Sequence, residues 1–349
     1  MVRPIEIRTA PHLKRPRGVD EIMRNVVYAL LPVVGFSAWQ FGISAIALIL
    51  TTTMVAMLTE RLFSQLAGQG NTLGDWSVVI TGILLGLTLP PGFPLWMAAV
   101  AAFVGVALGK SLFGGLGFNV MNPALVGRAF VQAAFPVAIT TWTPAFVPGR
   151  FSEFIPSTLA LPFMKPDPVA PWIEALDIDG FTGATPLALQ KFQQITVSTT
   201  DLLYGNVIGS TGEASAVLIL AGGLYLAFRR MLDWRIPAGV FLGATLVAGP
   251  LWLLDGTTYP SPLFVWLSGG LMLGAWFMAS DMVASPVTPL GAFLYGVLIG
   301  VLTVVIRLFG GLPEGVMYAI LLSNAASPLI ASWTQPRVYG EIKRQEDGI

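Results

Sequence analysis

The stretch PLGAFLYGVLIGVLTVVIRLFGGL, residues 289–312, is almost entirely apolar and contains one charged residue, Arg307. A hydrocarbon core about 30 Å thick requires roughly 20 apolar residues in a helix, so this stretch is long enough to cross a bilayer. The whole chain shares its character, because 54% of its 349 residues are hydrophobic and 11% are charged. Soluble domains carry about 25% charged residues. The sequence therefore predicts an all-α integral membrane protein.

Ten segments have the length and composition of membrane-spanning helices. They are residues 22–40, 42–60, 75–92, 94–112, 122–140, 213–230, 236–254, 262–280, 289–308 and 314–333. Prolines and glycines within them are tolerable because neighbouring helices satisfy the freed backbone groups. No cleavable signal peptide is evident before the first segment, which we interpret as a retained anchor. About ten spans place both termini on one side of the membrane.

Lysine and arginine indicate which side that is. Of the 19 lysines and arginines, Arg128 falls well inside a span, and four fall in, or at the border of, one set of connecting segments, namely Arg150, Lys165, Lys191 and Arg307. The remaining 14 fall in the other set, which includes both termini and residues 229–235. Because cytoplasmic segments carry the excess of positive residues, we expect both termini in the cytoplasm and residues 141–212 on the outer face.

An internal repeat divides the chain. The pentapeptide LFGGL occurs at residues 112–116 and again at 308–312, and a segment with Asn and Pro follows each copy. Five predicted helices separate the copies, and an odd number inverts the orientation. We therefore expect two inverted five-helix repeats, residues 1–140 and 213–349, joined by an outer loop at 141–212. Such repeats are typical of proteins with a site near the membrane midplane, although a glycine-rich chain also repeats a pentapeptide by chance.

The residue types exclude several redox centres. The chain has no cysteine and one histidine, His12, which excludes thiolate-ligated iron–sulfur clusters, cysteine-based zinc sites and bis-histidine haem. The sequence contains neither a glycine-rich dinucleotide fingerprint nor a long basic block that would suggest nucleic acid. We expect no metal site, and any redox chemistry would use an organic cofactor or centres on partner subunits.

The sequence DGFTGATPL, residues 179–187, lies in the outer loop. Thr185 precedes Pro186, so it is well placed to cap a short helix whose first residue is the proline. Gly183 is free to adopt a positive φ, and the small residues before Thr185 would leave its hydroxyl accessible. A phosphate esterified there would lie at the positive end of the helix, where anions are stabilised. The structural and functional interpretations are therefore compatible.

Asp179, Thr182, Gly183, Ala184 and Thr185 reproduce the Asp-x-x-(Ser/Thr)-Gly-Ala-Thr flavinylation motif of membrane flavoproteins. Further segments extend the match over most of the chain: FGGLGFNVMNPALVGRAF at 113–130, STGE at 210–213, FMASDMVASPVTPLGAFLYGVLIG at 277–300 and PRVYG at 336–340. With these segments the chain resembles the D subunits of the Rnf ion-translocating ferredoxin:NAD oxidoreductase complexes.

This resemblance implies a cofactor, a function and partners. A separate FMN transferase would attach FMN to Thr185 through a phosphoester. The flavin would relay electrons between ferredoxin and NAD sites on partner subunits, in a redox-driven Na⁺ or H⁺ pump of the bacterial inner membrane. The implied partners are the other Rnf membrane and peripheral subunits, including a second covalent-FMN subunit and iron–sulfur subunits. The chain would be a translocase subunit with no NAD site of its own.

Asn119 and Asn122 lie three residues apart, and a helix would place them on one face. Asn122 and Pro123 also suit the N-cap and first position of a helix. The resemblance adds another interpretation, because both asparagines match positions that hold a noncovalent riboflavin in the sodium-pumping relative. Amides suit this role because they both donate and accept hydrogen bonds. Arg128 is expected to face the same cavity.

Charged residues within or beside spans are costly and by default functional. Lys110, Glu213 and Asp281 are of this kind. Lys110 is expected to extend its ammonium to the inner surface. Asp281 lies in a polar, proline-broken stretch, so it belongs either to an ion pathway or to an exposed loop.

Other interpretations remain open. The B subunit of the sodium-pumping NADH:quinone oxidoreductase shares NPAL and the Gly-Ala-Thr site, but it normally has a longer N-terminal extension. A passive channel for small solutes would have the same inverted repeat, and a membrane anchor would carry a vestigial loop. Covalent flavin would argue against the last two.

Overall fold

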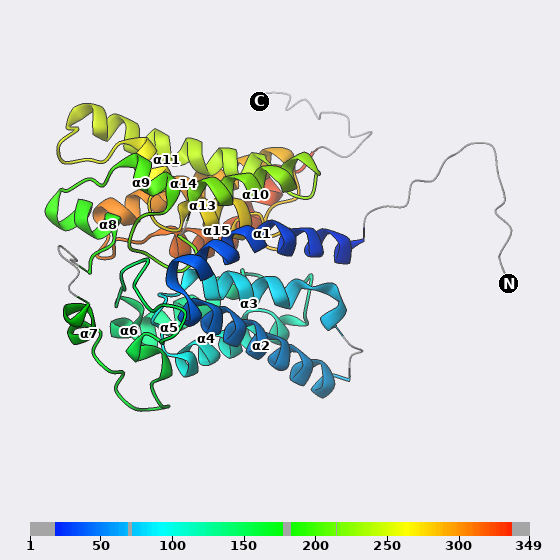
Figure 1. Ribbon diagram of the computed structural model, residues 1–349. Coiled ribbons are helices and arrows are strands. Elements are labelled where there is room, and N and C mark those ends of the chain that lie inside the picture. The colour runs from blue at the N-terminus through cyan, green and yellow to red at the C-terminus, as the bar shows by residue number, and fades with distance from the viewer. Residues whose placement is uncertain (1–17, 69–71, 177–182, 214, 337–349) are drawn as a thin grey trace, which may run out of the picture.

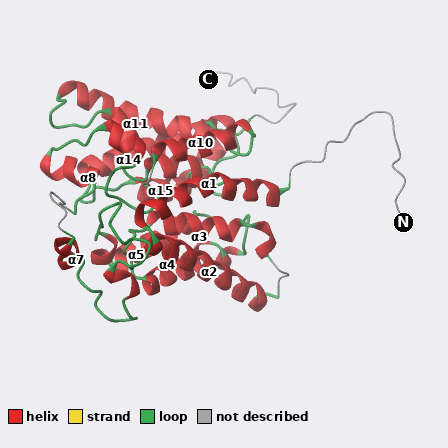
Figure 2. Cartoon of the chain, in the orientation of Figure 1, coloured by secondary structure: helices red, strands yellow, loops and turns green. Residues whose placement is uncertain are grey.

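The computed structural model describes residues 18–68, 72–176, 183–213 and 215–336. These residues form helices and connecting loops, with no strand among them (Figure 2). Six helices are long and apolar enough to cross a membrane. They are α1 (Val19–Phe41), α2 (Ile43–Leu66), α4 (Leu95–Gly109, extended by the 3-10 turn η2, Ser111–Phe113), α11 (Arg235–Leu254), α14 (Pro289–Phe309) and α15 (Val316–Trp333). The prediction of an all-α integral membrane protein is confirmed.

The other four predicted spans are helical but short or broken. They contain α3 (Ser77–Thr88), α5 (Pro123–Ala134) with α6 (Pro136–Ile139), α10 (Ala216–Phe228), and the series α12 (Pro262–Leu267), α13 (Leu271–Leu273) and η5 (Gly274–Met278). The local sequence explains both breaks. Pro136 lacks the N–H needed to continue α5, and the residues Ser268–Gly270 interrupt the eighth span with a glycine at positive φ.

Four helices begin in the same way, with a polar cap followed by proline. Asn122, Thr185, Ser261 and Thr288 each accept a backbone hydrogen bond from the first turn of the helix that follows. The cap satisfies a free N–H, and the proline at the first position loses no helical bond because its nitrogen has no hydrogen. These pairs set the starting residues of α5, α8, α12 and α14.

Figure 1 shows α2–α5 on one side of α1 and most of the second half on the other. Within the first half α2 packs on α3 and α4, and α4 packs on α5; within the second half α11 packs on α12 and α14, and α14 on α15. The helices before the two LFGGL copies end at different cavities. Lys110, at the end of α4, lines a cavity with the start of α1, whereas Leu312, after α14, lines one with Thr185. The division of the chain into two inverted five-helix repeats stays a prediction.

The helices α11 and α14 approach each other through glycines. A Cβ built at Gly243 would overlap the backbone of Val297, and one built at Gly300 would overlap the backbone of Val240. In lipid there is no hydrophobic force between helices, so their association depends on such close packing. Larger side chains at these positions would therefore prevent the contact between α11 and α14 in the second half.

The outer interval 141–212 contains three short helices: α7 (Ala170–Ala175), α8 (Pro186–Ala188, continued by the π turn η4, Leu189–Gln193) and α9 (Thr199–Tyr204). Its last part does not lie at the surface as expected. Ser37 donates a hydrogen bond of 2.5 Å to the Thr211 carbonyl, and the Gly212 N–H donates to the Leu87 carbonyl at 2.6 Å. Residues 209–212 are buried, and Thr211 and Gly212 are hydrogen-bonded to α1 and α3; the loop boundary predicted at residue 212 stays a prediction.

Candidate functional site

Thr185 occupies the helix-cap position that the sequence predicts. Its Oγ1 accepts a hydrogen bond from the Ala188 N–H at 3.3 Å, and Pro186 is the first helical residue. Gly183 has a φ of +65°, a conformation that costs glycine little. Thr185 is only 3% exposed, however. The expectation that its hydroxyl is open to the surroundings is wrong for this conformation, because the residue is buried and lines a cavity.

That cavity has a volume of about 280 Å³, and we call it the Thr185 cavity. Gly183, Ala184 and Thr185 form one side of it, and its apolar walls include Trp142, Phe192 and Leu312. A larger cavity of about 820 Å³ adjoins it and shares Gly183, Thr140 and Trp142. Small-molecule sites typically measure 300–1,000 Å³. The two cavities together have room for a nucleotide-sized group.

The helix after Thr185 is held against the second LFGGL copy. Lys191 donates hydrogen bonds to the carbonyls of Gly310 and Leu312, the latter at 3.1 Å. Partial burial lowers the pKa of Lys191. Gln190 donates to the Thr258 carbonyl at 3.1 Å. These bonds attach the segment that carries Thr185 to the C-terminal half of the protein.

Arg128 lies in the Thr185 cavity and not with the asparagines. It extends from α5, and its Nη2 forms an ion pair with Glu314, which precedes α15. Both residues line the Thr185 cavity. The expectation that Arg128 faces the cavity of Asn119 and Asn122 is therefore wrong. At 3.6 residues a turn, six residues beyond Asn122 correspond to about 240° of rotation around the helix, which turns Arg128 away.

Further polar and charged residues lie next to the Arg128–Glu314 pair. An inner cavity of about 30 Å³ is lined by Arg128, Glu314, Arg307 and Ser210. Arg307 donates to the carbonyls of Val265 and Ser268 at 2.8 and 3.0 Å, where α12 is interrupted. Ser210 donates to Glu213 at 2.8 Å. Arg307, which the sequence places in an outer segment, is thus buried where a spanning helix is broken, the usual setting of intramembrane polar sites.

Asn119, Asn122 and Asp281 line a different cavity, of about 90 Å³, which we call the asparagine cavity. Asn122 is a helix cap: its Oδ1 accepts from the backbone N–H groups of the first turn, and its Nδ2 donates to the Met278 carbonyl at 3.2 Å. Asn119 donates to Asp281 at 3.3 Å. The two asparagines do not share a helix face, because α5 begins only at Pro123, yet both reach the cavity. Asp281 is half-buried there and is not an exposed loop acid.

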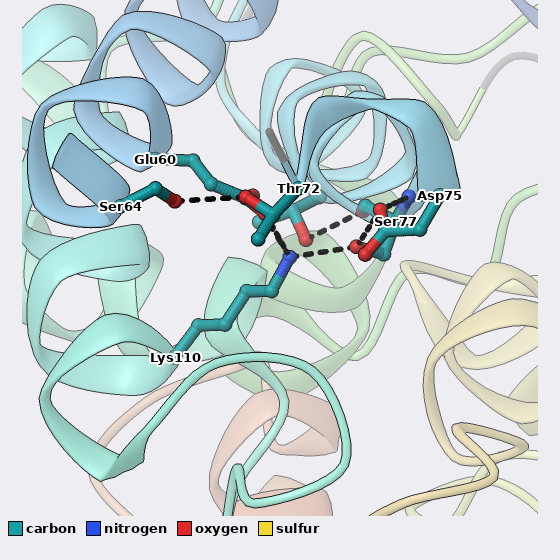
Figure 3. A network of polar contacts seen from close by, with 7 residues as sticks. Glu60, Ser64, Thr72, Asp75, Ser77 and Lys110 are labelled. Atoms are coloured by element: carbon teal, nitrogen blue, oxygen red, sulfur yellow. Dashed lines mark hydrogen bonds and ion pairs between the residues drawn. The ribbon is translucent and has the colours of Figure 1, made fainter. Parts of the chain in front are cut away.

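Lys110 does not extend to the surface. It is 2% exposed, and its Nζ donates to both carboxylate oxygens of Glu60 at 2.8 and 2.9 Å. Figure 3 shows the ammonium between Glu60 and Ser77, whose Oγ it reaches at 2.6 Å and which in turn donates to Asp75. The prediction for Lys110 is wrong because a buried carboxylate 50 residues earlier in the chain compensates its charge.

Asp179 and Thr182 lie outside the described residues, so the structure places only the second part of the predicted motif. Two residues that the sequence did not single out are Glu60 and Glu314. Each is an acid at the border of a predicted span. That position is itself a signal, since an intramembrane carboxylate requires a partner.

Comparison with known proteins agrees with the motifs. Residues 6–340 match the NQR2, RnfD, RnfE family. The D subunit of the ion-translocating oxidoreductase complex of Alcanivorax borkumensis is 38% identical over 341 residues, which cover 95% of this chain and 96% of the relative. The D subunit of the Na(+)-translocating ferredoxin:NAD(+) oxidoreductase complex of Acetobacterium woodii is 38% identical over 347 residues, 98% of each chain. The proton-translocating counterpart of Clostridium ljungdahlii is 37% identical over 347 residues, 96% of each chain. Together with the six long apolar helices, these matches establish that the chain is a multi-pass membrane protein of the NQR2, RnfD, RnfE family.

Proposed function

We propose that this chain is the flavin-bearing membrane subunit of a redox-driven ion pump and that FMN is attached to Thr185 through a phosphoester. The relatives are named as subunits of ion-translocating oxidoreductases. The observation that carries the cofactor assignment is the position of Thr185. It caps a helix and faces a cavity that also contains a buried arginine.

The residues around Thr185 fit such a group. Within the described part of the chain, Arg128 uses only Nη2 for a protein partner, and its Nε is buried without one. A buried donor without a partner is costly, and flavin carbonyls would satisfy it. FMN, when bound, supplies one- and two-electron transfer. Trp142, Phe192 and Leu312 would contact the apolar part of the group, and the start of α8 would favour the negative phosphate at Thr185.

Mass spectrometry tests this assignment directly. The protein is produced together with an active FMN transferase, and the peptide that contains Thr185 is isolated after proteolysis. An FMN adduct on Thr185 supports the proposal. A peptide without flavin contradicts it and leaves Thr185 with the role of a helix cap.

In this proposal, the transported ion and the partner subunits are inferred from the family. The Na(+)- and proton-translocating relatives are 38% and 37% identical to this chain, so overall similarity does not distinguish the two ions. Ferredoxin and NAD would react on partner subunits, which include iron–sulfur subunits and a second covalent-FMN subunit. The relatives that match are named as D subunits, which favours this assignment over the B subunit of the sodium-pumping enzyme.

We also propose that both termini face the cytoplasm of a bacterial inner membrane. The absence of cysteine makes single-cysteine labelling unambiguous. Ser152 and Gln65 are both exposed, the first in the outer interval and the second at the end of α2. A membrane-impermeant maleimide should label Ser152→Cys in intact cells and Gln65→Cys only after lysis. The reverse pattern would invert the topology.

A second, noncovalent flavin at the asparagine cavity is proposed on the family match. In this conformation the cavity, at about 90 Å³, is smaller than typical ligand sites of 300–1,000 Å³. The amide of Asn122 is already used by the helix cap and by the Met278 carbonyl. Asn119 is bonded through its Nδ2 to Asp281 and the Met121 carbonyl at 3.3 and 3.4 Å, so its oxygen is the group that fits, and binding would require the cavity to widen.

Separate alanine variants distinguish the two asparagines. Asn119→Ala should lower the flavin that acid extracts and leave covalent flavin unchanged. Asn122→Ala should cost about 1 kcal/mol of stability through the lost cap, measured as a lower unfolding temperature. If extractable flavin is the same in Asn119→Ala as in the wild type, the asparagine cavity holds no flavin.

A further inference from the structure

We propose that Arg128 contacts the flavin ring in the Thr185 cavity and raises its reduction potential, and that Glu314 is the positioning residue that holds and partly neutralises Arg128. This inference rests on the proposed attachment of FMN to Thr185. It concerns residues that are distant from the flavinylation motif in the sequence.

The Arg128 guanidinium is buried and incompletely hydrogen-bonded. Arg128 is 6% exposed and enters the cavity from α5. A guanidinium has five N–H donors, and in the described part of the chain only Nη2 has a partner, Glu314. Glu314 also keeps one buried oxygen, Oε1, without a partner. A pair that served only to join α5 to the start of α15 would leave these groups unsatisfied at a considerable cost.

The composition of the Thr185 cavity suits an aromatic ring. Its walls are largely apolar and aromatic, with Trp142, Phe192 and Leu312 among them. Such a lining suits a flat aromatic ring rather than a phosphate, and a few placed polar groups then fix its orientation. Arg128 and Gln132 are polar residues of α5 in this lining. Arginine suits the task, since its planar guanidinium both stacks on rings and donates hydrogen bonds.

The charges of Arg128 and Glu314 would change the reduction potential of a flavin in this cavity. Reduction adds electrons to the flavin, and a nearby positive charge stabilises added negative charge. Arg128 would therefore favour the reduced form. Glu314 opposes this effect because its carboxylate lines the same cavity. The two residues should consequently shift the flavin in opposite directions.

The test uses the full complex purified with its covalent flavin, titrated electrochemically while absorbance is recorded. At the wild-type midpoint of the Thr185 flavin, Arg128→Gln should decrease the ratio of reduced to oxidised flavin about tenfold, and Glu314→Gln should increase it by a similar factor. Arg128→Lys keeps the charge and should restore most of the wild-type ratio. Arg150→Gln is the matched control, because Arg150 lies in the outer interval over Phe146 and Phe151 and outside the cavity.

The outcomes separate this inference from the proposed function. Opposite shifts in the two variants, with none in Arg150→Gln, support it, and either variant alone is informative if the other does not assemble. Unchanged ratios in variants that carry covalent flavin would leave the Arg128–Glu314 pair as a structural link and overturn the inference alone. A wild-type subunit without covalent flavin, seen as the loss of ultraviolet fluorescence in a denaturing gel, overturns the proposed function and this inference with it.

Discussion

Replacing Thr185 by alanine should remove all covalent flavin from the subunit and stop electron transfer through the complex. The substitution deletes the only atom to which the proposed phosphoester can attach. It also deletes the acceptor for the Ala188 N–H, which costs about 1 kcal/mol. That cost is too small to explain the loss of a folded subunit. The measurement is in-gel ultraviolet fluorescence together with the enzymatic rate of the assembled complex.

Two hydroxyl controls make the result specific. Thr185→Ser keeps both the hydroxyl and the cap, so it should keep the flavin. Thr182→Ser changes the other threonine of the motif and should retain both flavin and activity. A fluorescent band that persists in Thr185→Ala would place the flavin on another residue and refute the assignment.

Replacing Gly243 by valine should prevent the second half from folding. The α carbon of Gly243 faces the backbone of α14 so closely that even one methyl group would overlap Val297. Overpacking typically costs 1–3 kcal/mol when side chains can adjust, and here the obstacle is backbone. We expect little monodisperse protein in size-exclusion chromatography of a detergent extract.

Gly249 on the same helix provides the comparison. A Cβ at Gly249 meets atoms only at 4.0 Å, which is ordinary contact. Gly249→Val should therefore be produced like the wild type, since valine is a somewhat better helix former than glycine. Equal yields of the two variants would mean that the α11–α14 contact does not limit folding.

Local chemistry explains what the sequence could predict. Span positions follow from apolar length, and the cap at Thr185 follows from the proline after it. The positive φ of Gly183 belongs to the same local pattern. These features depend on residues within one or two turns, so no knowledge of the tertiary structure is needed.

The wrong predictions concern residues whose partners are distant in the sequence. The sequence predicts Lys110 at the surface because its partner Glu60 lies 50 residues away, and it gives no partner for Arg128 because Glu314 lies 186 residues away. Intramembrane charges are positioned by whichever opposite charge the fold brings near, and a single sequence does not contain that pairing. The helix cap at Thr185 is therefore predictable, while the surroundings of the proposed flavin are not.

The burial of Thr185 has a consequence for the order of biosynthetic events. If FMN is attached to Thr185, the transferase must reach a residue that is 3% exposed while the segment is docked through Lys191. Modification must precede docking or wait for transient undocking. If undocking costs about 3 kcal/mol, roughly one molecule in 150 is reactive at any moment. The transferase would then have to modify Thr185 before the segment docks. A subunit whose segment docked first would enter assembly without its cofactor.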